Sequence, residues 1–191
     1  MANPTTGFSF PYVANYSLSG TSVVYSSGTL LARGVSVSLS PESNGDDVNF
    51  YADNIIAETA RGTFSGGSVT LTVDGLSTSA EALIYGLAGE DAGGFVNYGR
   101  NTVPYVGVGF VVRSMNAGTE YWRAIVLPKV RFQNAGVEAA TQEETIAFQT
   151  QELTADIFRD DTADKVWLKK GGYETTETAA VADIKALFNI A

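Results

Sequence analysis

The sequence predicts a mainly β protein, a β-sandwich or open barrel with one short mid-chain helix and a second helix at the C-terminus. Three observations predict this class. Aliphatic residues alternate with Ser and Thr in 35–40 and 68–73, the period of two that half-buried strands show. The stretch 103–132 reads as two long apolar strands, and helical signals are confined to 78–87 and 176–189. Many strands with few helices are typical of a sandwich or barrel on which a helix packs.

Residues 1–28 are rich in Ser, Thr, Gly and Tyr, and we expect an N-terminal arm with one or two short strands. Its apolar side chains are too numerous for a disordered tail, so we expect it to lie on another surface. Residues 29–191 form the sandwich domain. Its first half has expected strands at 29–40, 48–51, 55–58, 60–64 and 69–73, with turns at 41–47, 53–54 and 65–67.

The first helix is expected over 78–87. Thr78 and Glu81 have the spacing of a capping box, in which each side chain satisfies a free N–H at the helix start. The apolar stripe and the glycines that end the helix are Leu83, Ile84, Leu87, Gly86 and Gly89. Residues 88–102 contain four glycines and little periodicity, and we expect a long loop.

The 103–132 stretch is expected to be a hairpin with a four-residue loop at 115–118. That loop would place Val108 opposite Ile125 and Phe110 opposite Arg123. Both faces of the hairpin are largely apolar, whereas a hairpin with one solvated face alternates apolar and polar residues. One face must therefore meet the core, and the other a helix of the same chain or a neighbouring molecule.

The C-terminal part begins with an acidic loop at 133–144. Strands follow at 145–158, with Ile146 and Phe148 on one face, and at 165–170, separated by a turn at 160–164. The final helix, about 176–189, is expected to direct four apolar side chains inward: Val181, Ile184, Leu187 and Phe188.

The composition narrows the function. The chain has 191 residues, no Cys and no His, which removes disulfides, thiolate metal sites and every Ser/His or Cys/His nucleophile pair. No signal peptide or membrane-length apolar run is visible, so we expect synthesis in the cytoplasm and a soluble product. The net charge of -9 disfavours adhesion to nucleic acid. Residues 101–132 carry four basic and one acidic residue, and 133–164 eight acidic and one basic, so opposite patches can dock copies head to tail.

Four patterns resemble functional sites, and for each we favour a structural explanation. The acids at 46–47, 53, 160, 161 and 164 lack EF-hand spacing and are typical of solvated turns. Glu143 and Glu144 with Asp156 are the acids that a glycoside hydrolase would pair, but acidic loops are common. The glycine run lacks the ending of a phosphate-binding loop; it comprises Gly86, Gly89, Gly93 and Gly94.

The fourth pattern is a basic stripe with interleaved aromatics, of a kind that binds nucleic acid: Arg113, Arg123, Lys129 and Arg131 with Tyr121 and Trp122. We expect these charges to be solvated or paired across strands, as Arg113 with Glu120. We predict no catalytic, cofactor-binding or metal-binding residue, no cofactor and no enzymatic activity. Gly107 and Gly109 leave a shallow groove on one strand face, most simply explained by packing within the chain.

Several stretches, in this order, resemble the major tail protein family of siphophages that infect Gram-positive bacteria, the subunit of the phage tail tube. They span the chain from about residue 30 to the end and comprise 50–54, 67–76 leading into 81–83, 104–110, 129–132, 146–150 and 186–188. The N-terminal arm departs most from the family, and no additional immunoglobulin-like domain follows.

The resemblance implies a structural virion protein with a tail-tube-like fold. Six copies would form a ring, each contributing strands to a continuous inner barrel. Rings would stack around the tape-measure protein and later conduct DNA, which passes without adhering. The implied partners are further copies of the chain, the tape-measure protein, the tail terminator and the baseplate or distal tail proteins, with no membrane insertion.

Two other functions remain open. One is a monomeric β-sandwich module that binds carbohydrate or a cell surface, with an aromatic platform of Tyr98, Tyr105, Tyr121 and Trp122. The other is a subunit like the inner tube of a secretion system, which shares the architecture. Rings or tubes in solution would favour a tube, and a persistent monomer that binds a glycan would favour the module.

Overall fold

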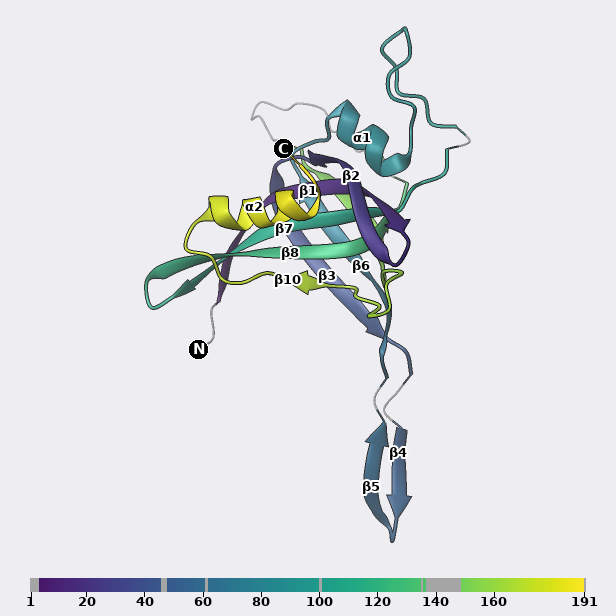
Figure 1. Cartoon of the computed structure of the whole chain (residues 1–191), viewed down its shortest axis with the longest axis vertical. Helices are drawn as coiled ribbons and strands as arrows, with labels where there is room; N and C mark the ends of the chain where they lie inside the picture. The colour runs from purple at the N-terminus through teal and green to yellow at the C-terminus, as the bar shows by residue number, and fades with distance from the viewer. Residues whose placement is uncertain are drawn as a thin grey trace.

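The computed structural model describes residues 4–45, 48–60, 62–99, 101–134, 136 and 149–190, and it confirms the mainly β fold class. Figure 1 shows a strongly curved sheet, a helix lying across it and a hairpin that projects from one end. The elements are β1 Thr5–Ser19, β2 Ser22–Leu30, β3 Gly34–Ser43, β4 Val48–Ala52, β5 Ile55–Ala60, β6 Phe64–Val73, α1 Thr78–Tyr85, β7 Val106–Asn116, β8 Thr119–Phe132, β9 Gln151–Phe158, β10 Lys169–Lys170 and α2 Glu177–Leu187.

The main sheet is antiparallel throughout, with the order β2-β1-β7-β8-β9-β6-β3, and β10 pairs with β8. The sheet curls until β3 returns to β1, where Phe8 packs against Gly34. The inner face encloses the main hydrophobic core, which includes Val69, Phe110 and Leu153. A curved sheet that buries its inner face in this way matches the predicted sandwich or open barrel.

The N-terminal residues are part of this sheet. Residues 1–28 were expected to be an arm, but β1 and β2 pair with each other and β1 pairs with β7 over most of its length. Val13 on β1 is fully buried in the core. An antiparallel strand can carry polar residues on its solvent-exposed face while it remains part of the sheet. This explains why residues 1–28 are rich in Ser and Thr.

The hairpin β7–β8 has the predicted strands but a different turn. Only Ala117 and Gly118 lie between the paired residues Asn116 and Thr119, and both have positive φ, 48° and 84°. This two-residue turn suits the twist of a hairpin. The expected four-residue loop was therefore wrong, and the register moves by two residues, so that Val108 faces Leu127. A shift of two preserves the side on which each residue points, and the two predicted faces hold.

A bulge near the start of β7 changes which β8 residues point inward. Val106 pairs with Val130, whereas Val108 pairs with Leu127, so β8 has one residue more than β7 between these two pairs. Leu127 and Val130 consequently both reach the core. Lys129 therefore lies on the outer side of the sheet, where it contacts Asp161 and the rings of Tyr16 and Tyr105.

The second face of β7–β8 is covered by α2, which lies across β7 and β8 in Figure 1. Gly107 and Gly109 allow the close approach: a Cβ at Gly109 would lie 2.8 Å from Ile184 Cγ2, and one at Gly107 would lie 2.5 Å from Tyr25 Cε1. The glycine groove is thus filled within the chain. The 103–132 hairpin needs no outside molecule, because its own C-terminal helix supplies the second cover.

The helices begin and end close to the predicted positions. Ser77, not Thr78, caps α1, because its side chain accepts the N–H of Ala80, and Gly86 ends the helix in the left-handed conformation. Thr176 caps α2, which buries Ala180 and Ile184 while Leu187, predicted to face inward, is 37% exposed. Ile84 and Tyr85 of α1 enter the main core.

Other, smaller expectations also change. The predicted turn at 65–67 lies within β6, Val35 on β3 is exposed, and of the strand predicted at 165–170 only Lys169–Lys170 pairs. The strand predicted at 145–158 begins at Gln151, and Ile146 and Phe148 lie outside the described residues.

We expect Gly109→Ala to destabilise the protein by about 1–3 kcal/mol, because the added methyl group overlaps Ile184 and Phe188 and displaces α2. Urea unfolding measures this change. The matched control is Gly99→Ala, where a Cβ meets nothing within 4 Å and the change should stay within about 0.5 kcal/mol. Equal effects at the two glycines would contradict the packing of α2 described here.

Candidate assembly surfaces

The hairpin β4–β5 projects beyond the hydrophobic core of the described chain. It forms its own two-stranded sheet and projects from the end of the molecule (Figure 1). The predicted turn is confirmed: Asp53 and Asn54 both have positive φ, 52° and 64°. Phe50 is 64% exposed and Ile55 67% exposed, and Tyr51 and Ile56 are also exposed. None of these four side chains belongs to a hydrophobic core cluster of the described residues.

Apolar side chains lie on both faces of this hairpin. Tyr51 pairs with Ile56, and the next pair, Ala52 with Ile55, points to the opposite face. An isolated two-stranded hairpin is at best marginally stable in water. Burying one large apolar side chain contributes roughly 1.5–3 kcal/mol. Contact with another surface would therefore bury these side chains and stabilise the hairpin.

A second projection is the loop that follows α1. Its turn is organised by Asp91, whose Oδ1 accepts the N–H groups of Gly93 at 2.8 Å and Phe95 at 3.0 Å. These hydrogen bonds, together with one from Asn97, hold the pKa of Asp91 below its ordinary value. Tyr98 donates to Glu81 of α1 at 2.5 Å and anchors the loop. The result is an ordered turn that presents Phe95, 70% exposed, to the outside.

The outer face of β3, β6 and β9 has a different character. Its side chains form rows across the three strands: Ser36–Thr72–Glu152, Ser38–Thr70–Thr154 and Ser40–Ser68–Asp156. In the first row Ser36 Oγ donates to Thr72 Oγ1 at 2.9 Å. The three strands contain acidic residues but no Lys or Arg. We call these nine residues the hydroxyl face; the opposite side of the same strands lies in the main core.

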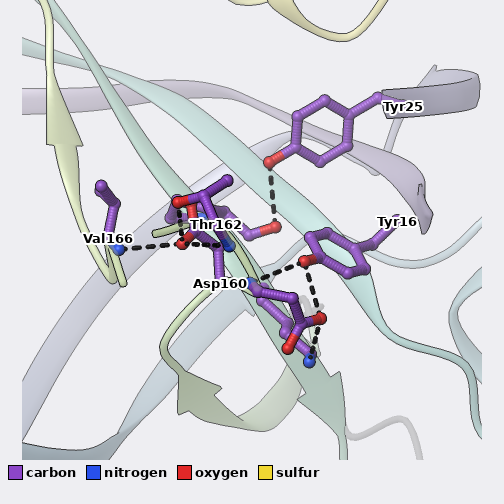
Figure 2. A network of polar contacts seen from close by, with 8 residues as sticks. Tyr16, Tyr25, Asp160, Thr162 and Val166 are labelled. Atoms are coloured by element: carbon purple, nitrogen blue, oxygen red, sulfur yellow. Dashed lines mark hydrogen bonds and ion pairs between the residues drawn. The ribbon is translucent and has the colours of Figure 1, made fainter. Parts of the chain in front are cut away.

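A network of polar contacts lies where β1, β2 and β8 meet the segment 159–168 (Figure 2). Tyr16 donates its hydroxyl to Asp161 Oδ2 at 2.9 Å, and Lys129 Nζ approaches the same oxygen at 2.7 Å. Tyr25 donates to the carbonyl of Pro128 at 3.0 Å. Lys129 also lies over the rings of Tyr16 and Tyr105.

The same network explains the buried carboxylate of Asp160. Its Oδ1 accepts from Thr162 N, Thr162 Oγ1 and Val166 N, at 3.2, 2.7 and 2.9 Å (Figure 2). Burial raises the pKa of the Tyr16 hydroxyl to about 12. The hydrogen bond from Lys129, followed by that from Tyr16, lowers the pKa of Asp161. The polar groups of this network form hydrogen bonds with one another, and we interpret its role as structural. We call Tyr16, Tyr25, Lys129, Asp160 and Asp161 with their partners the latch.

The acids considered for metal binding or hydrolysis are not assembled into a site within the described residues, where no group of three or more potential ligands is found. Asp53 lies in the hairpin turn, and Asp160 and Asp161 belong to the latch. Asp156 accepts from Gln133, whereas Asp46, Asp47, Glu143 and Glu144 lie outside the described residues. Asp164 is exposed in the turn that precedes Lys165.

The glycine run and the basic stripe are engaged within the chain. Gly86 is a helix cap, and the N–H groups of Gly93 and Gly94 donate to Asp91. The basic residues each have a partner: Arg113 bridges Glu120 at 3.3 Å, Arg123 donates to Gly171, Lys129 contacts Asp161, and Arg131 lies over Tyr105. The Arg113–Glu120 pair was predicted.

The four residues of the expected aromatic platform each pack against a different part of the chain. Tyr98 contacts Tyr85, Tyr105 contacts Phe158, and Tyr121 contacts Tyr173. Trp122 points to the opposite face of β8 from Tyr121 and packs beneath α2. Sequence reasoning missed the exposed hairpin as a functional element. The signal was present, because an Asp-Asn turn flanked by Phe-Tyr and Ile-Ile predicts a hairpin too short to bury its own side chains.

No protein-family model matches the sequence, and no curated protein is significantly similar to it. The resemblance to tail tube proteins therefore stays a prediction. Among the described helices, neither α1 nor α2 has the length and apolar character needed to cross a bilayer.

The latch gives a pH prediction. Because the pKa of Asp161 is lowered from its ordinary 3.8 in the folded protein, its stabilising contribution is present above about pH 4 and is lost as the pH falls further. We expect Asp161→Asn to reduce the unfolding free energy at pH 7 by no more than about 1 kcal/mol, because Asp161 is partly solvated. The difference from wild type should shrink toward pH 3. Asp183→Asn on the exposed side of α2 is the control, and a pH-independent difference for Asp161→Asn would contradict the latch.

Proposed function

We propose that this chain is a structural virion protein, the subunit of a phage tail tube. In this proposal copies assemble into hexameric rings, and the rings stack into a tube that encloses the tape-measure protein and conducts DNA during ejection. The observation that carries the proposal is the apolar hairpin β4–β5, which projects from the main body of the fold. A hairpin exposed on both faces is explained if neighbouring copies cover it.

The sheet edges support the same proposal. Within the described residues β2 and β3 end the strand order, and each has one neighbour in the main sheet. Open edges are normally protected against pairing with other chains, and closure of several subunits into a ring removes them. Strand pairing between copies would extend each sheet into a common inner barrel.

We assign the hydroxyl face to the interior of the tube. Nucleic acid adheres to proteins chiefly through Lys and Arg, which release counterions from the phosphates. The hydroxyl face offers short neutral hydroxyls and the carboxylates of Glu152 and Asp156 instead. DNA would slide past such a surface without binding. The same surface is polar and hydrated, which suits transient contact with a tape-measure protein.

The remaining partners follow from the geometry of a stacked tube. The first and last rings each leave one surface uncovered, and the tail terminator and the baseplate or distal tail proteins would bind there. The protein would accordingly reside in the virion after synthesis in the host cytoplasm. No step of this function requires a catalytic group or cofactor.

The proposal predicts that Phe50→Gln combined with Ile55→Gln abolishes assembly while the monomer stays folded. Both side chains lie outside the core, so the free energy of unfolding should change by no more than about 0.5 kcal/mol. Size-exclusion chromatography and negative-stain microscopy at high concentration measure assembly. The control is Leu187→Gln, an exposed apolar residue on α2.

Rings or tubes for wild type and Leu187→Gln, with a monomer for the double variant, would support the proposal. Tubes formed equally by the double variant would show that the hairpin does not carry assembly. A wild-type chain that remains monomeric at high concentration would contradict the tube function and favour the monomeric binding module.

A further inference from the structure

An open groove lies beside α1. It has a volume of about 550 Å³, within the range of roughly 300–1,000 Å³ typical of binding pockets. Its walls are mainly apolar and come from three separate parts of the chain: Tyr16 on β1, Ala82, Leu83 and Leu87 on and after α1, and Pro104 and Tyr105 before β7. Asn15 and Ser27 supply polar groups at its margin.

Hydrogen bonds and one close backbone contact fix the walls of the groove. Tyr16 N donates to the carbonyl of Tyr105 at 3.0 Å, and the Tyr16 hydroxyl is fixed by the latch. On the other side Gly86, in its left-handed conformation, lets the chain pass close to Thr102. These constraints place an apolar, preformed surface next to solvent, where it can receive apolar side chains from another molecule.

Two basic residues lie beside the groove, and one of them, Lys129, is already paired with Asp161. Lys129 lies 4.4 Å from the centre of the Tyr105 ring, and Arg131 lies 5.7 Å from it. The hairpin β4–β5 has the opposite character, because it carries Asp53 at its turn and Glu58 on β5 but no Lys or Arg. Apolar side chains and an acidic turn on one surface thus match apolar walls and basic residues on the other.

The hairpin and the groove lie toward opposite ends of the molecule, since α1 is near the top of Figure 1 and β4–β5 at the bottom. The hairpin of a given copy is therefore remote from its own groove. A contact between two different surfaces of identical copies is heterologous, and it links copies head to tail into a ring or a filament instead of closing into a symmetric pair.

We propose that the hairpin β4–β5 of one copy docks into this groove of the next copy, with Phe50, Tyr51, Ile55 and Ile56 supplying the apolar contact and Asp53 approaching Arg131. The proposal rests on the tube function and names the partner surface of its hairpin. It assigns the groove a role that no motif in the sequence indicated, and it sets the direction of assembly, hairpin to α1.

Cysteine cross-linking tests this contact cleanly, because the chain has no Cys of its own. The variant Ile55→Cys combined with Ala82→Cys places one thiol on the hairpin and one in the groove. Under mild oxidation of assembled protein we expect a ladder of covalent dimers, trimers and longer chains on a denaturing gel. Each single variant can give dimers at most, since one thiol per copy forms one disulfide.

The matched control is Ile55→Cys combined with Asp183→Cys, which keeps the hairpin thiol and moves the second to the exposed side of α2. Docked thiols meet at an effective concentration near the millimolar range, so the groove pair should give roughly tenfold more trimer and longer species than the control. Thermal unfolding of every variant verifies that each is folded.

Tubes of the groove variant that give no more ladder than the control would overturn the docking while leaving the tube function intact. Absence of any assembly by the wild-type chain would overturn the tube function, and the docking with it. As a second readout, Ala82→Trp should fill the groove and reduce assembly with the monomer still folded; unchanged assembly would count against the docking.

Discussion

The packing of α2 against the glycine-containing face of β7 is the contact on which the rest of the structure depends. Gly107 and Gly109 remove the side chains that would hold the helix away, and Ile184 and Phe188 occupy the space. The long hairpin β7–β8 is thereby covered on both faces within one chain, by the main core and by α2. The central strands therefore need no neighbouring copy to cover them. Among the described residues, a surface that still lacks a cover is β4–β5, a hairpin that the core does not reach.

The sequence predicted the class of fold and most elements, because those follow from local periodicity. The buried strand 69–73, the Asp53–Asn54 turn, the start of the final helix near residue 176 and the Arg113–Glu120 pair were all found as expected. The register of β7–β8 was harder to predict, because it depends on the length of one turn. The turn has two residues, Ala117 and Gly118, instead of the expected four, and this difference shifted every pair of the two strands. The N-terminal strands were misread as an arm because Ser and Thr describe a wet strand face as well as a polar tail.

The candidate surfaces could be anticipated only in part. Exposure of Phe50 and Ile55 depends on how far the hairpin extends beyond the core, which is a property of tertiary structure. The groove combines β1, α1 and the segment before β7, so no single stretch of sequence contains it. The polar rows across β3, β6 and β9 arise from strand order, in which residues more than 80 positions apart, such as Ser68 and Asp156, become neighbours. These surfaces support one account: a stable monomer whose hairpin, groove and polar face serve a directional assembly.

The most direct test of this account is a cryo-electron microscopy reconstruction of the particles that the purified full-length chain forms at high concentration. The account predicts a tube in which β4–β5 of each copy is buried against a neighbouring copy and the hydroxyl face of β3, β6 and β9 lines the channel. A reconstruction with the hairpin free in solvent, or with the hydroxyl face on the outside of the tube, would contradict it.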